Sequence, residues 1–198
     1  MQRSPSSTDR RPAPLRAGLA AILAAAVVLG GSGTARAGEI QLSAFAGGEG
    51  SSWRGDGAGF VGLRLGFRFV DLVGPYVMFR AGYANVDERI LELVQIGGQI
   101  WARIGITRPY LRFGLVHQHE EPWASVKSDV LGGLIGVGDG IRHRMGFDGA
   151  LGVDLPFKQY KHFQFHATLE AVVSGFPDAK GPRFYGGAIS GIGFNYSL

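Results

Sequence analysis

The sequence contains no cysteine and comparatively few charged residues. Without cysteine in its 198 residues, the chain excludes disulfide frameworks, cysteine-ligated zinc and thiol catalysis. Charged residues make up 18% of the chain, below the ~25% of typical soluble proteins, whereas 33 residues are glycine. After Gly38 no uninterrupted apolar run reaches the ~18 residues that indicate a transmembrane helix. Helical periodicity is also missing there, so the sequence does not favour a helical fold.

Residues 1–37 have the features of a secretory signal peptide. Four arginines and a single aspartate precede an apolar stretch at 17–29, which is followed by the A-x-A cleavage motif Ala35-Arg36-Ala37. The alternative is an N-terminal membrane anchor, but the apolar stretch is short for a span of ~20 residues and a cleavage site follows it. We therefore expect a cleaved leader at 1–37 and one exported domain at 38–198.

The leader accounts for the basic character of the chain. It holds five of the 20 basic residues and one of the 16 acidic residues, which leaves 15 of each in 38–198. The formal net charge of +4 therefore does not indicate nucleic-acid binding.

Apolar and polar residues alternate with a period of two throughout 38–198. Between Gly59 and Phe69, for example, the odd positions are apolar and the even positions are Phe60, Gly62, Arg64, Gly66 and Arg68. Such alternation between glycine- and proline-rich turns predicts antiparallel strands. Eight segments show it: about 39–47, 58–70, 75–85, 91–104, 109–118, 141–155, 162–174 and 183–198. The predicted fold class is all-β, an eight-stranded antiparallel up-and-down transmembrane β-barrel. Its connections are short at one end and mostly longer at the other, with the longest loop at 119–140.

Two kinds of barrel share this pattern and differ in which face is inside. A soluble lipocalin-like carrier buries the apolar face around a ligand, whereas a transmembrane barrel turns that face to lipid. The polar face is sparse and glycine-rich, which suits a narrow lumen. The apolar face is continuous, with aromatic residues gathered near the short turns, as in an interfacial belt. This favours the membrane barrel, with Leu65, Leu151 and Leu169 facing lipid near mid-membrane.

The leader, the eight amphipathic segments and the alternating final segment together resemble small bacterial outer-membrane β-barrels, of the outer membrane protein A transmembrane-domain or opacity-protein kind. In that family the last strand usually ends in Phe, an assembly signal, whereas this chain ends in Leu198. The resemblance implies a monomer in the outer membrane of a Gram-negative bacterium, without catalytic activity or cofactor. Its implied partners are outer-membrane lipid, lipopolysaccharide and the assembly machinery. Loop 119–140, with Trp123, is the expected surface for external contacts.

Four charged residues on the polar face are expected to meet inside the barrel. The turn at 71–74 sets Arg64 roughly opposite Arg80, and the turn at 156–161 sets Asp148 near Glu170. In an eight-stranded barrel these two like-charged pairs face each other across a lumen just wide enough for side chains. The sequence therefore predicts a neutralising Arg64/Arg80–Asp148/Glu170 cluster that plugs the lumen. The alternative is that strand stagger offsets these levels, so that each charge meets water or other groups such as Arg68, Arg103, Arg112 and Asp154.

Two further clusters could carry chemistry. The His117-Gln-His119 pair, followed by two glutamates, has a workable zinc geometry on a strand, but no further histidine lies close in sequence, so we predict no metal site. Lipid A deacylases resemble this architecture and use a His-x-Ser-Asn motif with a glutamate. The nearest match, His166-Ala-Thr168 with Glu170, has Thr in place of Ser and lies on the lumen face by parity. We therefore expect the protein to have no enzymatic activity.

Overall fold

The structure is a computed structural model that describes residues 38–51, 54–69, 72–128, 141–178 and 181–198. The predicted leader at 1–37 lies outside the described residues, as do parts of the predicted turn at 70–74 and loop at 119–140. No helix among the described residues is long and apolar enough to cross a bilayer.

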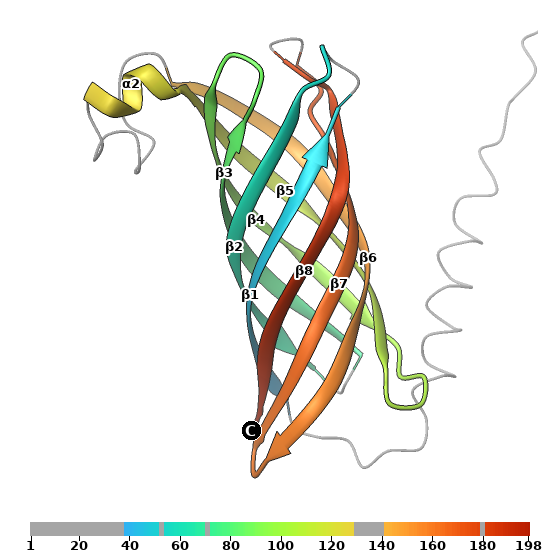
Figure 1. Cartoon of the computed structure of the whole chain (residues 1–198). Coiled ribbons are helices and arrows are strands. Elements are labelled where there is room, and N and C mark those ends of the chain that lie inside the picture. Colours follow the sequence, from blue (N-terminus) through green and yellow to red (C-terminus); the bar gives the residue numbers. More distant parts are fainter. Residues whose placement is uncertain (1–37, 52–53, 70–71, 129–140, 179–180) are drawn as a thin grey trace, which may run out of the picture. The chain divides into compact units, whose positions relative to one another are not determined.

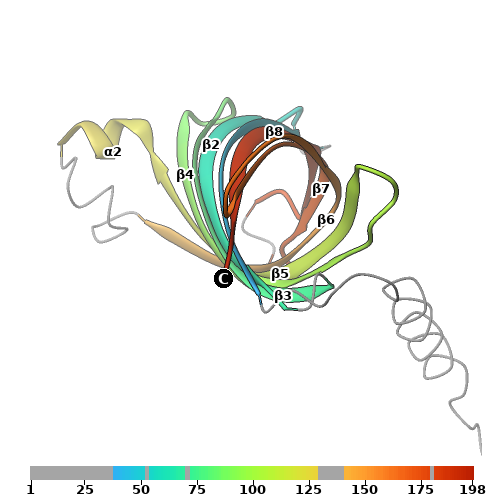
Figure 2. The ribbon, with the colours of Figure 1, turned by 90° about the horizontal axis from the view of Figure 1, so that it is seen from below.

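Eight antiparallel strands pair in chain order, and β1 also pairs with β8, which closes the sheet into a barrel (Figures 1 and 2). This is the fold class that the alternation predicts. The strands are β1 (Glu39–Gly50), β2 (Gly57–Arg68), β3 (Val73–Ala84), β4 (Arg89–Trp101), β5 (Arg108–Pro122), β6 (Arg142–Tyr160), β7 (Phe163–Gly175) and β8 (Phe184–Ser197).

The apolar face of every strand points out of the barrel. Leu65, Leu151 and Leu169 are 49%, 61% and 51% exposed, whereas their sequence neighbours Arg64, Ala150 and Glu170 are buried. This confirms the predicted orientation of the two faces. The soluble lipocalin-like alternative is wrong for this chain, because a carrier would expose the polar face and bury these leucines.

The strands β5 and β6 extend furthest beyond the ranges that the sequence pattern predicted. β5 continues to Pro122, so residues 119–122 belong to a strand and not to the loop at 119–140. Glu120 still points inward there and binds Arg89 and Arg144 on neighbouring strands, which stabilises this extension. β6 likewise continues to Tyr160 through an irregularity at Pro156–Lys158, where the sequence predicted a turn.

A short helix that the sequence did not predict follows β5. Helix α2 (Trp123–Ser128) begins directly after the strand, and the backbone N–H of Trp123 donates to the carbonyl of Glu88, 2.7 Å away. Val126 is buried, and together with Trp123 it lines a groove on the outer wall beside Ile90. The helix therefore rests against the rim at the end of the barrel opposite the C-terminus (Figure 1).

Candidate functional site

The four charged residues predicted to cluster all point into the barrel interior. Arg64, Arg80, Asp148 and Glu170 are each at most 5% exposed. Arg64 forms an ion pair with Glu170, and Nη2 of Arg80 lies 3.5 Å from Oδ2 of Asp148. The structure thus brings each predicted arginine to one of the predicted carboxylates, across the lumen from β2 and β3 to β6 and β7.

The strand register keeps like charges apart. Arg64 pairs across β2–β3 with Met78, and Arg80 with Gly62, so the two arginines are offset by two residues. Asp148 pairs with Ser174 and Glu170 with Gly152, so the two carboxylates are offset by four. These offsets place each carboxylate at the height of an arginine on the other side.

A third arginine, which the predicted cluster of four does not include, joins the two pairs. Nη1 of Arg112 donates to Oδ1 of Asp148 and Nη2 donates to Oε2 of Glu170, each at 2.9 Å. Arg112 pairs across β5–β6 with Ala150, which lies between Asp148 and Gly152, the cross-strand partner of Glu170. Parity places Arg112 inside, but only the register across three strands places it between the two carboxylates.

Neutral donors complete this central network. Tyr110 Oη donates to Oε1 of Glu170 at 2.6 Å, and Gln95 Nε2 donates to Oδ1 of Asp148 at 2.7 Å. Ser174 Oγ donates to the other oxygen of Asp148 at 2.9 Å, and Glu49 forms a second ion pair with Arg80. Burying a charge is costly unless it is paired and hydrogen-bonded, and both carboxylates meet that condition.

A second network closes the end of the barrel near α2. Its centre is Glu120, which accepts from Arg89 at 2.8 Å, from Arg144 at 2.9 Å and from Arg142. Arg89 also pairs with Asp56, and Arg144 with Asp178 at 3.0 Å. Its members come from five separate segments: the β1–β2 connection, β4, β5, β6 and the segment after β7.

A third polar group lies toward the other end, where Glu39 pairs with Arg68 and Arg108. Asp154 accepts from Gln41 at 3.2 Å and lies 3.9 Å from Nε2 of the buried His166.

The residues of the lipid A deacylase alternative are all inside the barrel. His166 and Thr168 are buried, Thr168 Oγ1 lies 2.7 Å from Tyr110 Oη, and Glu170 is held by two arginines. These side chains face the lumen, whereas the chemistry of a deacylase needs contact with lipid.

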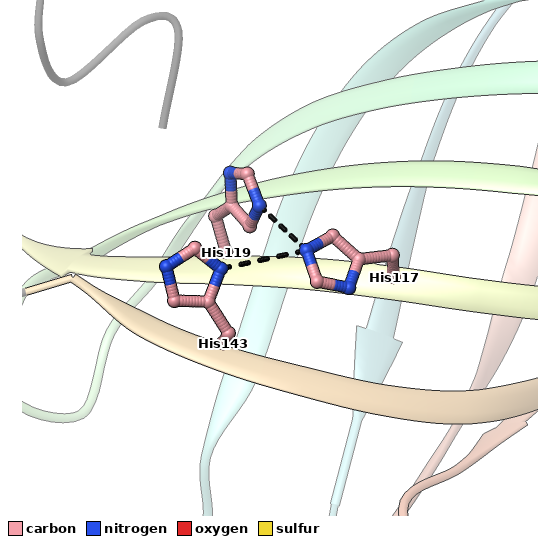
Figure 3. Close-up of side chains that lie close together, drawn as sticks. All are labelled: His117, His119 and His143. Atoms are coloured by element: carbon pink, nitrogen blue, oxygen red, sulfur yellow. Dashed lines mark hydrogen bonds between the residues drawn. The ribbon is translucent and has the colours of Figure 1, made fainter. Parts of the chain in front are cut away.

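Three histidines gather on the outside of the wall, at the same end as α2. His117 and His119 point outward from β5, and His143, the cross-strand partner of His119, does so from β6 (Figure 3). One ring nitrogen from each lies within 4.8 Å of the others. No further histidine lies close to this pair in sequence, but strand pairing brings one beside it from 24 residues further along the chain. We call these residues the outer histidine cluster.

Comparisons with known proteins support the fold. No protein-family model and no curated protein sequence matches the chain. Among solved structures, Neisserial surface protein A is 15% identical with a TM-score of 0.54, covering 81% of this chain and 97% of that one. The N-terminal barrel of Pseudomonas aeruginosa OprF is 18% identical (TM-score 0.48; 80% and 97% covered). Ail of Yersinia pestis is 15% identical (TM-score 0.49; 81% and 99% covered). The chain thus has the fold of small eight-stranded outer-membrane β-barrels, which the sequence resemblance implied.

Proposed function

We propose that the chain is an outer-membrane β-barrel without catalytic activity whose lumen is closed by its own charged side chains. The observation that carries this proposal is the bridge of Arg112 between Asp148 and Glu170. With Arg64 and Arg80 on the opposite strands, the bridge places three guanidinium groups in the middle of a narrow barrel.

The interior leaves little room for a continuous water path. An eight-stranded barrel is just wide enough for side chains to fill it, and Arg64, Arg80, Arg112 and Arg144 are among the largest fully buried residues. Aromatic rings also lie against these guanidinium groups: Tyr110 against Arg64 and Tyr76 against Arg112, at 5.4 and 5.3 Å from ring centroid to Cζ. A solute would have to displace several paired charges in order to pass.

The apolar exterior supports a place in a membrane, and the predicted leader supports export to the outer membrane of a Gram-negative bacterium. In this arrangement Gly38 and Leu198 lie on the periplasmic side, and α2 and the loops near it face outward. Those loops, with Trp123, are the proposed surface for contact with lipopolysaccharide or external partners, and the barrel acts as a monomer after insertion by the assembly machinery.

Fractionation and conductance together test the proposal. The protein is expected in the outer-membrane fraction, with a gel mobility that changes on heating, and it should give no steady large conductance in planar bilayers. A steady large conductance from wild type overturns the closed lumen. Recovery in the periplasmic extract overturns the membrane location.

The enzymatic alternative has a separate test. Cells that express the protein should keep the lipid A masses of control cells, because His166, Thr168 and Glu170 face the lumen. A mass shift that disappears in the His166→Ala variant would show that the barrel modifies lipid A.

A further inference from the structure

The outer histidine cluster brings three ring nitrogens together on one outward patch. Nε2 of His117 lies 2.7 Å from Nε2 of His119 and 3.4 Å from Nδ1 of His143 (Figure 3). Neutral imidazole nitrogens are common ligands of zinc and of similar divalent metals. The hydration of a polar strand end does not by itself explain three ring nitrogens this close together.

We propose that the outer histidine cluster binds a divalent metal ion of the zinc type. In a tetrahedral site with Zn–N bonds of ~2.0–2.1 Å, ligand nitrogens lie ~3.3–3.4 Å apart. The His117–His143 separation of 3.4 Å already has this value. The His117–His119 separation of 2.7 Å has to widen by roughly 0.6–0.7 Å, which small side-chain rotations supply.

Neighbouring groups prepare the site for a cation. Nδ1 of His117 lies 2.8 Å from the sulfur of Met145, its cross-strand partner on β6. A proton on Nδ1 directed at that sulfur leaves Nε2 with its lone pair toward the other two rings, the kind of outer contact that fixes the tautomer of a ligating histidine. Glu92, the cross-strand partner of His119 on β4, faces the same outer side by parity and is buried in the groove beside α2.

The backbone holds the ligands on a rigid support. All three histidines lie on paired strands and not in loops, and residues two apart on a strand, like His117 and His119, project to the same face. Three protein ligands leave a fourth position open, and His143 is exposed, so water can occupy that position. The site thus has the composition of a three-histidine zinc centre with one exchangeable ligand.

Zinc binding to the whole folded chain, prepared without a histidine tag, tests the proposal directly. Zn²⁺ is titrated against a chromogenic chelator, and one ion per barrel is expected. His143→Asn should weaken binding by at least about tenfold, because losing even an outer-shell partner of a zinc ligand costs ~10–100-fold. His162→Asn, at the opposite end of the barrel, is the matched control and should bind as wild type does.

Cobalt gives a second readout that depends on geometry. Co²⁺ bound to wild type should show the intense visible absorption of a four-coordinate ion, and His143→Asn should lose it. Heat-dependent gel mobility establishes that each variant is folded. The three-residue site is overturned if His143→Asn binds zinc as tightly as wild type does. It is also overturned if wild type binds zinc no more tightly than a variant in which all three histidines are replaced. A barrel that conducts ions yet binds zinc here overturns the proposed closed lumen and leaves the metal site intact.

Discussion

The two faces of β5 place polar side chains in opposite surroundings. Inward residues at even positions and outward residues at odd positions alternate from Arg108 to Glu120, and the outward face changes from apolar to polar near α2. The inward face includes Tyr110, Arg112, Gln118 and Glu120, and the outward face includes Leu111, Phe113, Leu115, His117 and His119.

The partners of these polar groups differ between the faces. Inside, Arg112 and Glu120 are each held by charges from other strands, so both Nη atoms of Arg112 and both carboxylate oxygens of Glu120 are engaged within the fold. Outside, within the part of the chain that the structure describes, the ring nitrogens of His117 lie against His119, His143 and the sulfur of Met145. Polar groups already satisfied by the fold stabilise it, whereas lone pairs that converge on one point at the surface can bind a ligand.

The largest effect is expected from the inner face. Glu170→Ala leaves Arg64 and Arg112 buried without their shared carboxylate, and it should lower the free energy of unfolding by ~3–5 kcal/mol. Urea unfolding in lipid vesicles, followed by tryptophan fluorescence, measures the loss. Leu169→Ala, the adjacent residue on the lipid-facing side, is the control and should cost much less. A loss below about 1 kcal/mol for Glu170→Ala would mean that water reaches the arginines.

A charged side chain on the outer face should destabilise the barrel, although the lumen holds several charged side chains. Leu151→Arg places a guanidinium among lipid chains, and it should cost ~2–4 kcal/mol at mid-membrane. Leu151→Met, which keeps the side chain apolar, controls for packing. If the arginine variant inserts and unfolds like wild type, residue 151 does not face the hydrocarbon.

Two consecutive glycines on β4 allow the two faces to be compared by the effect of one added methyl group. A Cβ on the inward Gly97 would lie 2.1 Å from the carbonyl oxygen of Phe113 and 2.8 Å from Tyr76 Oη, whereas one on the outward Gly98 would meet only the ring of Phe113, at 3.3 Å. Gly97→Ala should therefore cost ~1–3 kcal/mol, and Gly98→Ala clearly less. The same urea titration compares them, and equal losses would show that the lumen wall yields as easily as the lipid-facing surface.

Zinc binding should produce the smallest change in the free energy of unfolding. Free Zn²⁺ at ten times its dissociation constant should stabilise the barrel by about 1.4 kcal/mol, provided that it binds only the folded chain. A chelator should reverse the change, and His143→Asn should show none. Stabilisation that persists in this variant would place the ion elsewhere.

The alternation in the sequence was enough to predict the strands, their order and the orientation of their faces. Leu65 and Arg64 could be assigned to opposite faces because adjacent residues of a strand project to opposite sides. The ends of β5 and β6 were predicted less well, since polar residues such as Glu120 have the composition of a loop and remain in a strand only because arginines from other strands bind them.

The candidate sites depended on register, which the sequence pattern does not specify to the residue. Arg112 and His143 each lie on the face that parity predicts. Their partners were decided by how far each strand is shifted along its neighbour, and this shift follows from closing all eight strands at once.

The sequence alone therefore determined an eight-stranded barrel with an apolar exterior and a charged, glycine-rich interior, because a period of two is a local property of the chain. Only the tertiary structure decided that Arg112 lies between Asp148 and Glu170, and that His143 lies beside His117 and His119. Each of these contacts joins residues more than twenty positions apart, and the stagger of the closed sheet sets the distance between them.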